Sequence, residues 1–308
     1  MKERNLKNMA ASVRSRLLNI ARQSGKPFDQ LLSLYGQERF LFRLSLTPYK
    51  EKLILKGGLL LVGLGFPQVR PTRDIDLLGL MNSDIETISS ILKEIVNKDV
   101  DDGMKFDLDE LNYKIMSPDS EYPSLRFKFL GNLGQAQIPM QIDVGFGDQV
   151  IPEIKEIEFP TLLDMEPPRV AAYSIESVIA EKFEAALDLA DLNSRMKDFY
   201  DIWALSRSYS FDGKVLREAI IATCSKRQTA IETHASLFSA EFANRTEKQT
   251  QWEAFVRKGM FEQAPETFTY LMREIRSFLL PLTESFEKSK SFNSEWMPGG
   301  TWVGKGNY

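Results

Sequence analysis

The pattern of apolar residues changes near Pro167-Pro168, and this change constrains the fold more than any other feature of the sequence. Before it, the segment 124–148 alternates polar and apolar residues, which predicts a hairpin of two strands joined by a turn at Gly131-Asn132. After it, apolar residues recur every three or four positions, which predicts helices over 174–192, 195–206 and 215–224. We therefore expect an α+β protein, with a small mixed sheet followed by a helical domain.

Further elements are expected in the first half of the chain. Residues 6–46 have helical spacing with a break at Gly25-Lys26-Pro27. Residues 53–67 predict the end of one element, a tight turn at Gly57-Gly58 and a buried helix, and residues 72–80 predict a strand. These expectations divide the chain into an N-terminal helical segment (1–50), a core (51–167), a helical domain (168–285) and a flexible tail (286–308).

Composition limits the kinds of site that the chain can form. Its one cysteine, Cys224, cannot form an internal disulfide, and its one histidine, His234, cannot supply the clustered ligands of a zinc site. Any bound metal is therefore expected to be held by oxygen atoms. No stretch is apolar enough for a membrane span or a signal peptide, which predicts a cytoplasmic protein without a membrane partner.

Charge is distributed unevenly along the chain. Residues 1–73 carry a net charge of +10 and residues 74–170 a net charge of −12, within a total of −4. A basic region beside an acidic one suits an enzyme that binds a polyanion and concentrates metal cations. Two solvated faces that neutralise each other would give the same counts. The basic side chains on the N-terminal helices are consistent with either interpretation: Arg14, Arg16, Arg22, Arg39 and Arg43.

Two aspartates, Asp74 and Asp76, interrupt an apolar strand. Residues two apart in a strand point to the same face, so these carboxylates should project side by side, with Asp143 on a neighbouring strand. Like charges so close together repel unless a cation neutralises them. Mg2+ prefers oxygen ligands, and a pair of such ions stabilises displacement at phosphorus. The three aspartates predict a site for two Mg2+ ions, with Mn2+ as the alternative, unless they lie on a merely solvent-facing strand.

A second group of charges lies in the helical half. Lys182 falls on the apolar stripe of its helix, so it should either extend to solvent or approach a buried anion such as a triphosphate. Asp198 and Asp201 lie near the start of the next helix, where the dipole favours negative charge, so a structural role competes with a functional one. The neighbouring aromatic residues are expected in the core rather than as platforms for bases: Phe199, Tyr200 and Trp203.

Four motifs in this order resemble the AbiEii family of nucleotidyltransferase toxins from bacterial type IV toxin–antitoxin systems. They are KGG (56–58), TRDIDLL (72–78), QIDVGFGD (141–148) and the helical pair AEKFEAALDL and SRMKDFYDIW (180–203). The resemblance runs from about residue 10 to residue 281 and implies a nucleotidyltransferase domain related to DNA polymerase beta, followed by a helical domain. One departure is Gly58, which stands where the signature usually has serine.

The resemblance also implies an activity, site residues and partners. A nucleoside monophosphate would pass from an NTP to an acceptor, in several members the 3′ end of tRNA, and the partner would be a winged-helix antitoxin that forms no stable complex. Asp74, Asp76 and Asp143 would bind metal and catalyse the reaction, together with Lys182 and with Asp198 or Asp201. Nucleotide contacts would come from Gly57, Gly58, Thr72, Arg73 and Lys182.

Two other functions are compatible with the same residues. The acceptor could be a hydroxyl of a protein or of a small molecule, because the sequence does not distinguish acceptors. The second alternative is a non-catalytic module on the same fold that binds RNA or a partner. The presence of all three carboxylates argues against it.

Overall fold

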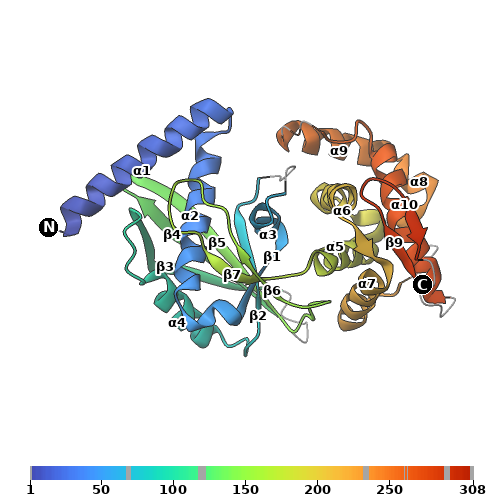
Figure 1. Cartoon of the computed structure of the whole chain (residues 1–308), viewed down its shortest axis with the longest axis horizontal. Helices are drawn as coiled ribbons and strands as arrows, with labels where there is room; N and C mark the ends of the chain where they lie inside the picture. The colour runs from blue at the N-terminus through green and yellow to red at the C-terminus, as the bar shows by residue number, and fades with distance from the viewer. Residues whose placement is uncertain are drawn as a thin grey trace. The chain divides into compact units, whose positions relative to one another are not determined.

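The computed structural model describes residues 2–66, 71–116, 123–231, 236–259, 261, 263–287 and 292–305 (Figure 1). It divides into two compact units, Met1–Gly147 with Ile154–Ala172, and Asp148–Glu153 with Tyr173–Tyr308. The expected parts 1–50 and 51–167 thus share the first unit. The predicted α+β fold class is confirmed, with a mixed sheet in the first unit and helices dominating the second. None of the helices in the described part of the chain has the length and apolar character needed to cross a membrane.

A seven-stranded mixed sheet, of order β3-β4-β5-β2-β1-β7-β6, forms the first unit. Its central strand β2 runs parallel to β5 on one side and antiparallel to β1 on the other. This pairing brings segments that are far apart in sequence into direct register. The strands are β1 (Leu53–Lys56), β2 (Asp74–Gly79), β3 (Met104–Met116), β4 (Ser124–Leu133), β5 (Ala136–Phe146), β6 (Lys155–Glu158) and β7 (Arg169–Ala172).

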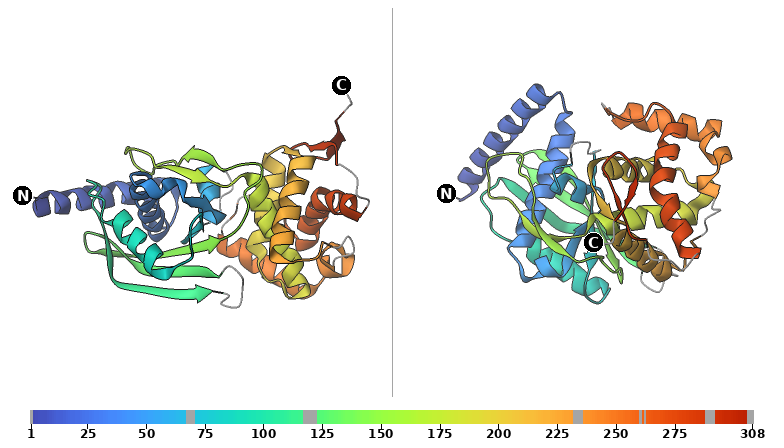
Figure 2. Two further views of the ribbon diagram at one scale, coloured as in Figure 1. Left: turned by 90° about the horizontal axis from the view of Figure 1, so that it is seen from below. Right: turned by 45° about the vertical axis from the view of Figure 1, so that its right-hand side comes forward.

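One face of this sheet is buried beneath helices. Alternate residues of β2, β4 and β5 are apolar and fully buried, among them Ile75, Phe127 and Ile142, each 0% exposed. Helices α2 (Phe28–Ser45) and α4 (Ile85–Val96) pack together against this side, as Figures 1 and 2 show. The intervening residues of the same strands point to the opposite, open face. The remaining helices of the unit are α1 (Lys2–Ser24), η1 (Pro48–Glu51) and α3 (Gly57–Gly63).

Neither interpretation of Arg39 and Arg43 is correct, because both arginines are buried in the core, at 1% and 2% exposed. Arg43 donates hydrogen bonds to both carboxylate oxygens of Asp102, at 2.6 and 3.0 Å, and Arg39 lies 2.6 Å from a carboxylate oxygen of Glu38. The Arg43–Asp102 pair fixes α2 within the unit, as do the hydrogen bonds from Leu162 N–H to Glu38 and from Arg39 to the carbonyl of Glu166, so neither arginine is exposed to RNA. The exposed basic side chains on α1 include Arg14 and Arg22.

The hairpin of β4 and β5 is confirmed, but the predicted turn is wrong. Leu133 pairs with Ala136, so the turn consists of Gly134 and Gln135, and Gly131 is a ladder residue opposite Ile138. Gly134 has a φ of +62°, a conformation that glycine adopts without steric cost, whereas the other glycine lies in extended strand.

The second unit is mainly helical. Its core includes the aromatic residues predicted to be buried, with Phe199 and Tyr200 at 1% and Trp203 at 6% exposed. A three-stranded sheet, β10-β9-β8, lies within the unit, and two of its strands fall in the segment 286–308 that we expected to be a flexible tail. The indole N–H of Trp296 donates to the carbonyl of Ser206 and holds this segment in place. The elements are α5 (Ile175–Leu189), η2 (Ala190–Leu192), α6 (Met196–Ser208), β8 (Phe211–Asp212), α7 (Gly213–Arg227), η3 (Ser236–Phe238), α8 (Ala240–Ala243), α9 (Thr246–Gly259), α10 (Phe268–Glu287), β9 (Ser294–Trp296) and β10 (Trp302–Gly304).

Candidate active site

Strand β2 presents two carboxylates on the open face of the sheet. Asp74 and Asp76 are partly exposed, whereas Ile75 and Leu77 between and beyond them are fully buried. This alternation is the one that the two-residue spacing predicts, since the apolar side chains anchor the strand and the acids are held on a rigid surface.

Four charged residues of four adjacent strands lie side by side in register, and we call them the charged row: Arg126, Asp143, Asp76 and Lys56. Asp76 on β2 is paired with Asp143 on β5 and with Lys56 on β1, and Asp143 is paired with Arg126 on β4. The two acids at the centre are therefore flanked by a cation on each side. This arrangement lowers the cost of placing like charges on neighbouring strands.

Arg126 forms a bidentate ion pair with Asp143. Its Nε lies 2.8 Å from Oδ1 and one terminal nitrogen lies 2.7 Å from Oδ2, while the amide of Gln141 lies 3.4 Å from Oδ2. The hydrogen bond to Asp143 raises the pKa of Arg126 above its ordinary value; partial burial opposes this, and the charges of Asp143, Asp74 and Asp76 add to it. Sequence reasoning missed Arg126, although its position in the alternation of the hairpin could have placed it on the same face as Asp143.

The carboxylates of Asp76 in the charged row and of Asp74 beside it suit a divalent metal ion at two of the three predicted positions. Asp74 and Asp76 present hard oxygen donors on one face, as Mg2+ requires. Asp143 differs, because both of its oxygens already bond to Arg126. Across the described ranges, no three acidic, histidine or cysteine side chains are grouped as ligands of one ion. The metal-binding role of Asp143 thus stays a prediction.

Gly57 makes room for the carboxylate of Asp76. It has a φ of +68°, and a Cβ added there would lie 2.0 Å from Oδ2 of Asp76. Any other residue would therefore be strained in backbone conformation and would displace the carboxylate. Gly58 follows in the first turn of α3 and is buried. The KGG motif thus has a direct steric reason for its first glycine.

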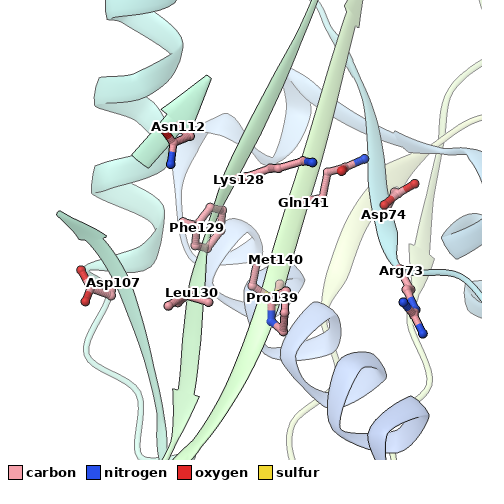
Figure 3. A pocket seen from close by; sticks show the side chains of 10 residues that line it. All are labelled: Arg73, Asp74, Asp107, Asn112, Lys128, Phe129, Leu130, Pro139, Met140 and Gln141. Atoms are coloured by element: carbon pink, nitrogen blue, oxygen red, sulfur yellow. The ribbon is translucent and has the colours of Figure 1, made fainter. Parts of the chain in front are cut away.

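A hollow of about 420 Å³ adjoins Asp74 on the open face. Its volume lies within the range of small-molecule sites. Figure 3 shows the side chain of Gln141 directed toward Asp74, with Lys128 beside it and Arg73 extending away. The walls combine these polar groups with apolar ones, including Pro139 and Met140. Thr72 lies just before β2, where its carbonyl is 3.5 Å from the amide nitrogen of the buried Gln37.

The helical half contains a group of charges that we call the helical cluster: the buried Lys182, Asp198 and Asp201, and Arg195, whose side chain is 46% exposed. Lys182 on α5 lies 3.1 Å from Asp198 Oδ1 and 2.7 Å from Asp201 Oδ2, both on α6. Arg195 lies 2.7 Å from the other oxygen of Asp198. Lys182 is only 8% exposed, so the expectation that it extends to solvent is wrong, and the anions that it approaches are the two aspartates.

Electrostatics keep Asp198 of the helical cluster ionised. Burial raises the pKa of Asp198, but the charges of Lys182, Arg195 and Lys197 outweigh burial, so the pKa lies below its ordinary value. The carboxylate is therefore charged at neutral pH despite being 2% exposed. The charged row belongs to the first unit and the helical cluster to the second.

The lone cysteine belongs to neither group. Cys224 is buried, and burial raises its pKa to about 12, so its thiol is unreactive at neutral pH. His234 lies outside the described residues.

Two solved structures are similar to this chain at low sequence identity. The crystal structure of JHP933 from Helicobacter pylori is 15% identical, with a TM-score of 0.47 over 82% of this chain and 90% of that one. A second H. pylori structure, provisionally named as a nucleotidyltransferase, is 14% identical, with a TM-score of 0.43 over 82% and 94% of the two chains. A comparison with curated proteins gives no significant match.

A family model provides the stronger relationship. The model described as nucleotidyl transferase AbiEii toxin, type IV TA system, matches residues 39–274. This range begins within α2, ends within α10 and includes every member of the charged row and of the helical cluster. The chain therefore belongs to the AbiEii family of nucleotidyltransferase toxins from type IV toxin–antitoxin systems, and it is a transferase that acts on nucleotides within such a system.

Proposed function

We propose that this protein transfers a nucleoside monophosphate from an NTP to an RNA acceptor, the 3′ end of tRNA, in a reaction that depends on a divalent metal. The observation that carries the proposal is the register of β2 and β5, which sets Asp76 directly beside Asp143, with Asp74 on the same face. Carboxylates on neighbouring strands of a rigid sheet are a suitable support for metal ions and for a triphosphate.

Asp74 and Asp76 hold Mg2+ or Mn2+ in this proposal, and Asp143 completes the site when it is not paired with Arg126. The bound ions neutralise charge on the phosphates and favour ionisation of the acceptor hydroxyl. Gly57 keeps Asp76 in position. Gly58, Thr72 and Arg73 lie close to these carboxylates in sequence, and we assign them contacts to the nucleotide.

We assign the helical cluster a role in the same reaction. Lys182 neutralises charge that develops on the departing pyrophosphate, and Asp198 and Asp201 fix the position of its ammonium group. The ion pairs of 3.1 and 2.7 Å support the positioning role, because a lysine held from two sides loses little freedom during the reaction. Family membership supports the functional role of these residues.

Charge supports the proposed acceptor, and family membership supports the proposed partner. Exposed arginines on α1, including Arg14 and Arg22, offer cations to the phosphates of an RNA chain. Family membership implies an antitoxin, and we propose a winged-helix antitoxin that forms no stable complex with this chain. The reaction takes place in the cytoplasm, where both tRNA and NTPs are found.

Incubation of the full chain with each α-32P-labelled NTP, Mg2+ and total bacterial RNA tests the proposal, with Asp76→Ala as the control. Label in a tRNA-sized band from the unmodified protein alone supports the proposal and identifies the donor. Label on protein or on a small molecule would retain the chemistry and refute the RNA acceptor. Absence of label that depends on Asp76 from every acceptor, with Mg2+ or Mn2+, would contradict the nucleotidyl transfer itself.

A further inference from the structure

Arg126 is paired with Asp143, the carboxylate that should complete the metal site. Both oxygens of Asp143 accept hydrogen bonds from the one guanidinium, at 2.8 and 2.7 Å. A bidentate guanidinium uses one lone pair of each carboxylate oxygen, on the side from which a metal ion would contact both oxygens. A metal ion and Arg126 therefore cannot both bind these two oxygens in the same manner.

The influence of Arg126 extends over the whole acidic set. Its pKa is raised first by the hydrogen bond to Asp143 and further by the charges of Asp143, Asp74 and Asp76. Arg126 is thus a counter-ion for all three carboxylates. Arg126 thus partly neutralises the negative charge of the three aspartates, which a bound metal ion would otherwise have to neutralise.

The ion pair is accessible enough to be replaced. The side chain of Arg126 is 32% exposed and that of Asp143 is 21% exposed, so solvent reaches both partners. Water competes with each partner of a pair that is only partly buried, which limits the net free energy of the pair, and the bidentate geometry places it at the upper end of such pairs. The guanidinium can leave the carboxylate without a large penalty, which is not true of the buried helical cluster.

We propose that Arg126 and a divalent cation are alternative partners of Asp143, so that Arg126 sets the affinity of the site for metal. The inference rests on the proposed function, in which Asp74 and Asp76 bind metal. When the guanidinium is paired with Asp143, the site offers two carboxylates. When the guanidinium turns to solvent or to a phosphate, the site offers three.

The expected size of the effect follows from competition. A metal ion that must displace Arg126 loses the free energy of the ion pair from its own binding. At the upper end of measured exposed pairs this free energy is about 1 kcal/mol, which lowers the apparent affinity for the metal about fivefold. Replacement of Arg126 by glutamine should therefore tighten metal binding by about this factor. Lys128→Gln is the matched control, because Lys128 lies two residues away on the same face of β4 and is paired with Gln141 instead of Asp143.

Mn2+ titration of the full chain without nucleotide, followed by electron paramagnetic resonance of the free ion, tests the inference. We expect Arg126→Gln to bind Mn2+ about fivefold more tightly than the unmodified chain, and Lys128→Gln to change the affinity much less. Arg126→Lys keeps the charge and removes the bidentate geometry, so its affinity for Mn2+ should lie between those of the unmodified chain and Arg126→Gln. This variant provides the test if Arg126→Gln fails to fold. Equal affinities of the unmodified chain and the Arg126 variants, or an equal gain in Lys128→Gln, would overturn the inference.

A fourth variant separates this inference from the proposed function. Asp76→Asn should weaken Mn2+ binding, because it removes one of the two carboxylates that bind metal in either state of Arg126. If Asp76→Asn binds Mn2+ as well as the unmodified chain does, the ion is bound elsewhere, and both the proposed metal site and the inference fail. If Asp76→Asn weakens binding while the Arg126 variants change nothing, only the inference fails.

Discussion

The charged row and the helical cluster both place acidic side chains close together, but the cations that pair with these acids differ in their exposure to solvent. In the charged row the cation paired with Asp143 is 32% exposed and replaceable. In the helical cluster the lysine is 8% exposed and lies between two aspartates that are 2% and 1% exposed. The difference indicates that one group is built to exchange its cation and the other to retain it.

Burial explains why the two groups should respond differently to substitution. A charge in the core that loses its partner has no water to replace it, whereas an exposed charge is readily hydrated. The helical cluster should therefore affect stability as well as activity. The charged row should affect metal binding and activity with little effect on stability.

The largest expected effect tests the helical cluster. Lys182→Met leaves Asp198 and Asp201 without their shared cation, and loss of one partner of a buried ion pair costs about 3–5 kcal/mol in the free energy of unfolding. Urea denaturation measures it. Lys50→Met is the matched control, because Lys50 pairs at 3.5 Å with the well-exposed Glu156 and should contribute less than about 1 kcal/mol. Similar losses in the two variants would remove the distinction between buried and exposed groups.

The next effect tests the geometry of the charged row. Gly57→Ala places a Cβ where Oδ2 of Asp76 lies, so it should displace the carboxylate and reduce nucleotidyl transfer by on the order of a hundredfold. Gly65→Ala is the control, since Gly65 has a φ of +64° but nothing within 4 Å of the added atom. Both variants carry the backbone strain, and only the first touches the site. Equal activity in the two would show that Gly57 has no steric role at Asp76.

A smaller effect concerns pH. The pKa of Asp198 is lower in the folded protein than its ordinary value, so the unfolded chain binds a proton more readily, and the stability that Asp198 contributes is lost as pH falls. The loss should begin near the ordinary aspartate pKa of about 3.9 and continue below it. Unfolding free energies of Asp198→Asn should therefore decline less than those of the unmodified chain between about pH 6 and pH 3. Asp188→Asn, at an exposed position of α5, should follow the unmodified chain. An equal acid decline in all three proteins would contradict this account.

The smallest expected effect concerns arginines outside the charged row and the helical cluster, and it tests whether those exposed on α1 contribute to RNA binding. Arg14→Gln with Arg22→Gln should weaken RNA binding severalfold at low salt and reduce the salt slope by about 2, because each arginine releases about one counterion. Filter binding at several salt concentrations measures the slope. Arg39 and Arg43 should make no such contribution, since both are buried. An unchanged slope would exclude α1 from the RNA interface.

The sequence allowed much of the fold and part of the site to be predicted. An apolar run interrupted by two aspartates located β2, and alternation located the β4–β5 hairpin. Three- and four-residue spacing located most of the helices, because one face of each helix is buried. Strand β3 was missed, although residues 104–109 alternate apolar and polar side chains and could have predicted a strand there. The hairpin turn was misplaced, since two glycines in the loop region are equally permissive and only the register distinguishes them.

The contacts of the charged groups were the least predictable part. Spacing showed that Asp74 and Asp76 share a face, but the partner of Asp143 depends on a strand register that local sequence does not specify. Arg126 therefore remained unnoticed, and Arg43 was considered for RNA although it pairs with Asp102 in the core. Ionic partners distant in sequence require the tertiary structure.

Nucleotidyl transfer by two matched variants tests the central claim most directly. Asp76 lies in the charged row, whereas Asp107 is an exposed aspartate of β3 that lines the hollow beside Asp74. Transfer of label from an α-32P-labelled NTP should fall by roughly a thousandfold or more in Asp76→Asn and should remain close to that of the unmodified protein in Asp107→Asn. Transfer that survives in Asp76→Asn, or that is lost equally in both variants, would contradict the claim that the charged row is the site of the reaction.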